Sequence, residues 1–102
     1  MSDLQRKVAL FARHHQLQHD VEMHALDLVS EVGELVKEVL LATDYGRRPV
    51  QSRVELENEV GDTLYSLLAP AEACRVDAEA AVRATLRKYE RRLRERGDAS
   101  SA

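Results

Sequence analysis

Two pairs of acidic residues with the same spacing are the part of this sequence best suited to chemistry. Glu31 and Glu34 lie three residues apart, and Glu59 and Asp62 repeat that spacing. Residues at positions i and i+3 of a helix project to nearly the same side, so each pair would present two carboxylates together. Four carboxylates that face one another repel, and a divalent cation between them removes the repulsion. Because the ligand atoms would all be oxygens, the pairs predict a site for Mg²⁺, with Mn²⁺ as a substitute.

The surroundings of the two pairs argue against an ordinary solvated helix face. Apolar residues flank both pairs, and a glycine, Gly33 or Gly61, directly precedes the second carboxylate of each. A glycine inside a helix costs about 1 kcal/mol relative to alanine, so its presence at both positions favours close helix packing or room for a ligand. Glutamates three residues apart are common on exposed helices, and one pair alone would carry little weight. Two pairs with matching surroundings favour the metal site.

Four amphipathic helices are predicted to position these carboxylates. Apolar residues recur with the 3.6-residue period of a helix in four segments: Asp3–His15, Met23–Ala42, Ser52–Cys74, and from the Asp77 cap to Gly97. With 4 Gly and 2 Pro, the chain has too few turn residues for a sandwich or barrel of many short strands. Four helices with short connections predict an all-α fold, a four-helix antiparallel bundle.

Local signals predict where these helices begin, end or bend. Three positions are suited to N-caps: Ser2 (with Gln5), Ser52 (with Glu55) and Asp77. Gly97 is a natural stop for the last helix. Pro70 lies inside the third segment, where it should kink or interrupt the helix.

Length and composition limit the class of protein. The chain has 102 residues and one cysteine, which fits a single domain over residues 1–97 with a flexible tail at 98–102 and excludes an internal disulfide. No apolar run reaches the roughly 20 residues of a membrane span. Basic residues interrupt the N-terminal segment where a signal peptide would be apolar. We therefore expect a cytoplasmic protein without a membrane partner.

The net charge of −3 conceals two oppositely charged parts of the chain. Residues 20–79 contain 14 acidic and 5 basic residues, a local charge of −9, whereas residues 83–96 contain seven basic and two acidic residues, a local charge of +5. Aromatic residues do not interleave with these basic residues to stack bases, so we do not expect a nucleic-acid polymer as partner. Acidic residues that hold a metal and a few cations that meet phosphates would suit a nucleotide instead.

The acidic pairs also resemble a known signature. Residues 31–35 (EVGEL) and 59–65 (EVGDTLY) are similar to the ExxE…ExxD motif of the MazG-like all-α nucleoside triphosphate pyrophosphohydrolases, and residues 73–77 (ACRVD) resemble the turn before their last helix. The resemblance covers about residues 19–93. It implies that an NTP or dNTP is cleaved between the α- and β-phosphates with Mg²⁺. It also implies that Glu31, Glu34, Glu59 and Asp62 are metal ligands. Our own hypothesis is that Glu34, with Glu31, orients or deprotonates the attacking water.

The same resemblance suggests which residues bind the substrate. Lys88 and Arg92 lie four residues apart on the last predicted helix, so they share a face and could bind phosphates. Related proteins carry a K-x-x-x-N-x-x-R pattern there, of which only Arg92 is present; Thr85 and Tyr89 replace the Lys and the Asn. His19 lies near a histidine of dCTP-type relatives and is a further candidate for phosphate binding.

The sequence leaves two other functions and the assembly size open. One alternative is the related phosphoribosyl-ATP pyrophosphohydrolase of histidine biosynthesis. The other is a non-catalytic helical dimerisation or regulatory module of the same fold. The apolar faces of the second and third predicted helices are wider than one small bundle needs, so we expect a homodimer or homotetramer.

Overall fold

The computed structural model describes residues 2–101, which form four helices joined by short turns. In chain order these are α1 (Asp3–His14), α2 (Val21–Ala42), α3 (Val54–Ala73) and α4 (Ala78–Arg96). No strand occurs in this part of the chain. The all-α class and the four predicted helices are therefore confirmed.

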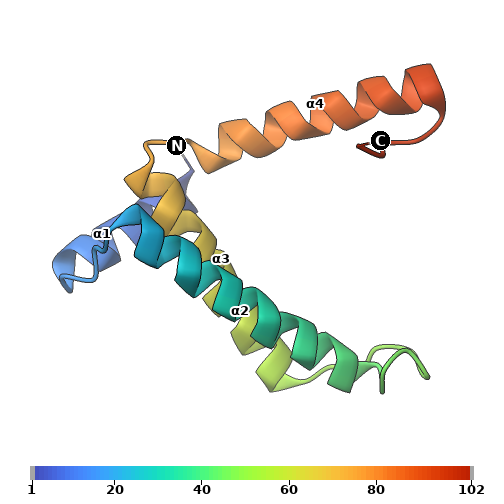
Figure 1. Cartoon of the computed structure of the whole chain (residues 1–102), viewed down its shortest axis with the longest axis horizontal. Coiled ribbons are helices and arrows are strands. Elements are labelled where there is room, and N and C mark those ends of the chain that lie inside the picture. The colour runs from blue at the N-terminus through green and yellow to red at the C-terminus, as the bar shows by residue number, and fades with distance from the viewer. Residues whose placement is uncertain (1, 102) are drawn as a thin grey trace.

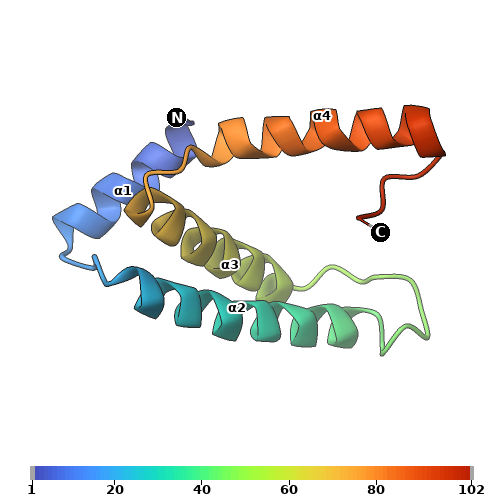
Figure 2. The ribbon, with the colours of Figure 1, turned by 45° about the horizontal axis from the view of Figure 1, so that its top comes forward.

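The first three helices pack together and the fourth stands apart. α2 and α3 form an antiparallel pair, α1 packs against α3, and α4 projects away from all three (Figures 1 and 2). The antiparallel bundle is therefore not closed within one chain.

Local caps explain most helix ends. Ser2 Oγ accepts a hydrogen bond from the Gln5 N–H at 3.2 Å, and Asp77 Oδ1 accepts one from the Ala80 N–H at 3.2 Å. α4 ends at Gly97, whose φ of 80° is the left-handed conformation that favours glycine. All three of these predicted ends are confirmed.

One local prediction in the third segment is wrong, and a second is wrong in part. The prediction that Ser52 caps α3 fails because the helix begins at Val54 after Arg53, without a capping bond from a side chain. Of the prediction that Pro70 kinks or interrupts the helix, the interruption is wrong because α3 continues to Ala73. Pro70 lies in the last turn, where the chain recovers bonds from Cys74 N–H to Pro70 O at 2.9 Å and from Val76 N–H to Ala71 O at 2.8 Å.

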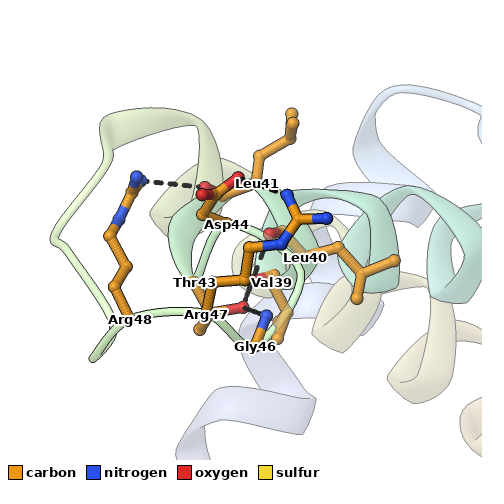
Figure 3. A network of polar contacts seen from close by, with 8 residues as sticks. All are labelled: Val39, Leu40, Leu41, Thr43, Asp44, Gly46, Arg47 and Arg48. Carbon is orange, nitrogen blue, oxygen red and sulfur yellow. Dashed lines mark hydrogen bonds and ion pairs between the residues drawn. The ribbon is translucent and has the colours of Figure 1, made fainter.

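A hydrogen-bonded turn returns the chain from α2 to α3 (Figure 3). The Thr43 hydroxyl donates to Val39 O at 3.0 Å and accepts from the Gly46 N–H at 3.2 Å. Arg48 Nη2 donates to Leu41 O at 3.2 Å. These side-chain bonds add to the backbone bonds at the end of α2 and hold the turn through which the chain returns toward α3.

A buried glutamine joins α1 to the turn between α3 and α4. Gln5 is fully buried, and its Nε2 donates to Val76 O at 2.8 Å and to Glu72 Oε2 at 3.2 Å. Its Oε1 accepts from the Ala78 N–H at 2.8 Å. Because Ala78 is the first residue of α4, these three bonds hold the start of that helix in a defined position.

The single chain has a very small apolar core. Its buried apolar residues within the described range are Ala12, Ala42, Leu68 and Ala69. Many larger apolar side chains are exposed on all four helices, with the largest number on α2. None of the four helices is long and apolar enough to cross a membrane.

Candidate metal centre

The antiparallel packing of α2 and α3 brings three of the predicted metal ligands together. Carboxylate oxygens of Glu31, Glu59 and Asp62 all lie within 4.8 Å of one another. A hydrogen bond from Thr63 Oγ1 to Glu31 O, 3.2 Å long, joins the two helices at the same level. The i, i+3 spacing of Glu59 and Asp62 directs both side chains of α3 toward Glu31 of α2.

The surroundings of Glu59 fit a bound cation. Its Oε2 is buried and has no hydrogen-bond partner within residues 2–101. Partial burial, a hydrogen bond with Glu31 and the charges of Glu31, Asp62 and Glu34 raise the pKa of Glu59 above its ordinary value. If Glu59 is ionised, this oxygen needs a positive charge close to it, and a divalent ion that binds oxygen ligands would supply that charge. The three carboxylates are therefore suited to a hard divalent cation.

Glu34 lies beside this group but is not part of it. Its Oε2 pairs with Lys37 Nζ at 3.0 Å, and both side chains are about half exposed. The hydrogen bond and charge of Glu34 raise the pKa of Lys37 above its ordinary value. Glu34 is nevertheless close enough for its charge to act on Glu59. The structure thus separates the four predicted ligands into three that converge and one at their margin.

A buried ion pair next to the site was not anticipated from the sequence. The Glu38 residue is only 7% exposed, and its Oε2 lies 3.3 Å from Arg53 Nη2, just before α3. Lys37 Nζ lies 3.9 Å from Glu38 Oε1. Glu38 follows Glu34 by four residues on α2, which is the spacing that could have indicated a third acidic residue on this face.

The predicted phosphate-binding residues of α4 lie away from the carboxylates of their own chain. Lys88 Nζ and Arg92 Cζ lie 5.4 and 5.9 Å from the centre of the Tyr89 ring. Arg92 Nη1 also donates to Ala99 O at 3.4 Å. Since α4 packs neither on α2 nor on α3 within the chain, the structure does not bring these cations to the acidic group.

His19 lies in the turn between α1 and α2. Its backbone N–H donates to His24 Nε2 at 3.2 Å, and the two imidazole rings lie 5.4 Å apart. Both histidines line a cavity of about 420 Å³ between α1 and α3 and a second of about 180 Å³.

The smaller cavity approaches the acidic group. Asp27 and Tyr65 also line it, and they lie about one helical turn from Glu31 and Asp62 respectively. The Tyr65 hydroxyl is buried without a hydrogen-bond partner in the described chain. The smaller cavity, lined by both polar and apolar side chains, therefore includes residues about one helical turn from Glu31 and Asp62.

Carboxylates from two antiparallel helices thus converge on one point in this all-α chain. The profile of the MazG nucleotide pyrophosphohydrolase domain matches residues 19–96, and the chain belongs to this family. The match includes all of α2, α3 and α4. A comparison with curated proteins gives no significant match, and a comparison with solved structures gives none either.

Proposed function

We propose that the protein is a Mg²⁺-dependent hydrolase that converts an NTP or dNTP to the monophosphate and pyrophosphate. The observation that carries this proposal is the convergence of Glu31, Glu59 and Asp62 around a carboxylate oxygen that has no partner. Membership of the MazG family supports activity on nucleotides in general. We also propose that the protein is cytoplasmic, as expected from its sequence.

The three convergent carboxylates would hold Mg²⁺, or Mn²⁺ in its place, with Glu34 at the margin. Such an ion supplies positive charge against the triphosphate and lowers the pKa of water. Because the three carboxylates lie on two packed helices, their oxygens are already positioned, and the metal ligands need little further ordering when the substrate binds.

Glu34 is the residue we assign to the attacking water. It is half exposed and paired with Lys37, so its carboxylate can accept a proton at the edge of the site. The water oxygen then bonds to the α-phosphorus while the bond from that phosphorus to the bridging oxygen breaks. The electron pair and the negative charge leave with pyrophosphate, and Glu34 takes the proton from the water.

Two cations and one histidine are proposed to bind the substrate. Lys88 and Arg92 bind the phosphates, because a lysine ammonium and an arginine guanidinium donate charge-assisted hydrogen bonds to phosphate oxygens. His19 would bind the substrate from the two cavities that it lines. The working assembly is a homodimer or homotetramer.

The test is a panel of NTPs and dNTPs incubated with the purified protein and Mg²⁺, Mn²⁺ or EDTA, with products separated by anion exchange. The Glu59→Gln and Asp62→Asn variants should each lose more than about 100-fold in kcat/KM, since a displaced metal forfeits several kcal/mol of charge stabilisation. Glu57→Gln is the matched control, because Glu57 is an exposed carboxylate of α3 outside the convergent group.

The products separate the proposal from its alternatives. Metal-dependent monophosphate and pyrophosphate support it, whereas diphosphate with orthophosphate would exclude attack at the α-phosphorus. If no nucleotide of the panel is cleaved, phosphoribosyl-ATP is the next substrate to assay. If that is also unchanged and calorimetry detects no Mg²⁺ binding, the non-catalytic helical module is the better description.

A further inference from the structure

Lys37 is the only lysine or arginine on the two helices that carry the acidic group. α2 and α3 contain five acidic residues each, and α3 contains neither a lysine nor an arginine. The ammonium nitrogen of Lys37 lies 3.0 Å from Glu34 Oε2 and 3.9 Å from Glu38 Oε1. The one cation of the α2–α3 pair therefore lies at the margin of the convergent carboxylates and contacts Glu34, the predicted ligand that does not join them.

The Glu34 side chain lies between two groups that compete for it. Glu31, Glu34 and Lys37 follow one another at intervals of three residues along α2, so each lies about one helical turn from the next. In the direction of Glu31, a cation held by the acidic group would attract the Glu34 carboxylate. In the other direction the ammonium of Lys37 attracts it, and the structure shows this second arrangement.

Glu38 favours the position in which Lys37 meets Glu34. The Glu38 residue is only 7% exposed, and its Oε2 lies 3.3 Å from Arg53 Nη2. Burial and this ion pair restrict the carboxylate of Glu38, whose other oxygen is the one next to Lys37. A fixed negative group thus stands behind the lysine, on the side away from Glu31.

The number of carboxylates around the ion matters for a nucleotide substrate. Mg²⁺ takes six oxygen ligands in an octahedral arrangement, and in phosphate-binding sites water and phosphate oxygens fill several of these positions. A fourth carboxylate would occupy one more position and would add negative charge where the triphosphate approaches. A residue that keeps Glu34 away from the ion would therefore leave room for the substrate.

We propose that Lys37 is a positioning residue that keeps Glu34 out of the coordination of the metal ion, so that three carboxylates rather than four hold the ion. The role of Lys37 rests on its contacts with Glu34 and Glu38 and on the convergence of the other three carboxylates. Its consequence for catalysis rests in addition on the function proposed above, in which Glu34 takes the proton from the attacking water.

The first test measures metal affinity and needs no turnover. Mg²⁺ is titrated by calorimetry into the metal-free full-length protein and into Lys37→Met. Without the ammonium, Glu34 is free to join the other carboxylates, so Lys37→Met should bind Mg²⁺ about two- to fivefold more tightly, the range expected for a pair that is half exposed. An unchanged or weaker affinity would overturn the proposal.

Two further variants serve as controls for this titration. Lys37→Arg keeps the positive charge and should restore the Mg²⁺ affinity of the wild type. Lys7→Met removes a lysine at an exposed position of α1, a helix that contributes nothing to the acidic group, and should also bind Mg²⁺ as the wild type does.

A double-mutant cycle separates contact with Glu34 from the effect of charge at a distance. Removal of any nearby cation favours the binding of Mg²⁺, whether or not Glu34 is present. The Lys37→Met substitution is therefore also made in the Glu34→Gln background, where no fourth carboxylate can join the ion. The gain in affinity should be at least about twofold larger when Glu34 is intact. Equal gains in both backgrounds would show that Lys37 acts only through its charge and would overturn the positioning role.

The nucleotide assay separates failure of this inference from failure of the proposed function. At saturating Mg²⁺, Lys37→Met should lose about two- to fivefold in kcat although it binds the ion more tightly, and Lys37→Arg should recover that loss. An undiminished kcat would refute the catalytic consequence. A wild type that binds Mg²⁺ but cleaves no nucleotide would refute the enzyme, and the cycle would still decide the role of Lys37. A wild type that binds no Mg²⁺ would overturn both.

Discussion

At the scale of single residues, Glu59 has the least favourable surroundings for a charge. Its buried oxygen has no partner in the described chain, and three neighbouring carboxylates act on it. A carboxyl whose pKa is raised by folding lowers the stability of the folded protein when it is ionised. The metal-free protein therefore folds against this repulsion, and metal binding to the folded state would offset it.

This argument predicts opposite effects of Glu59→Gln with and without metal. In EDTA the variant should have a higher Tm than the wild type, because the repulsion is removed. Mg²⁺ should raise the Tm of the wild type and leave the Tm of the variant almost unchanged. Differential scanning calorimetry measures both, with Glu57→Gln as control. A lower Tm of the variant in EDTA would contradict the account of the acidic group.

The Glu38–Arg53 pair supports a second residue-scale prediction, for stability alone. Removing one member of a buried pair strands the other charge. Arg53→Met should cost about 1–3 kcal/mol, less than a fully buried pair because Arg53 is one-third exposed. Glu38→Leu combined with Arg53→Met should recover most of that loss, as measured by urea unfolding. A double variant as unstable as Arg53→Met would show that the pair itself stabilises the fold.

At the scale of elements, one side chain links three helices. Gln5 was predicted to help cap α1, and its N–H does bond Ser2 Oγ. Its amide, however, crosses to Glu72, Val76 and Ala78, 67 to 73 residues away in sequence. No local pattern could reveal that use of a glutamine.

The Gln5→Leu variant tests this link between helices. It leaves the N–H of Ala78 and the carbonyl of Val76 without their partners, and unsatisfied buried groups cost about 1–3 kcal/mol each. We expect a lower Tm, because the three bonds that join α1 to the end of α3 and the start of α4 are lost. Gln51→Leu, at an exposed position in the loop before α3, is the control. An unchanged Tm in Gln5→Leu would show that the packing of these helices does not depend on this contact.

At the scale of the whole molecule, the small apolar core of a single chain limits its stability. Three of the four buried apolar residues among residues 2–101 are alanines, whereas a domain of this size is already marginal with an ordinary core. Its stability should therefore depend on association, and the Tm should rise with protein concentration.

A substitution on α4 tests this dependence. Leu86→Glu/Leu93→Glu should lower the Tm by several degrees and remove the concentration dependence, since charges at these exposed apolar positions of α4 would oppose association. Ala84→Glu, on the opposite side of the helix from Leu86, is the control. Scanning calorimetry at three protein concentrations measures both. A wild-type Tm independent of concentration would contradict the reliance on association.

Local patterns predicted much of the secondary structure and part of the site. Period, caps and stop signals placed four helices within a few residues of their observed ends, because such signals act over one or two turns. The spacing of Glu31, Glu59 and Asp62 indicated carboxylates on facing helices, and the structure brings these three together. The single domain over residues 1–97 and the flexible tail at 98–102 stay predictions; Met1 and Ala102 lie outside the described residues.

Tertiary structure decided the features that join distant parts of the chain. Glu34 shares its spacing with Glu31, yet it turns to Lys37, while Glu38 is buried with Arg53. The direction of α4 depends on Gln5, a contact that no helical period encodes. Periodicity tells which face of a helix is apolar, but the partner of that face is chosen by packing and charge across the whole assembly. Lys88 and Arg92 were therefore identifiable as cations from the chain, whereas their separation from the acidic group became visible only in the folded structure.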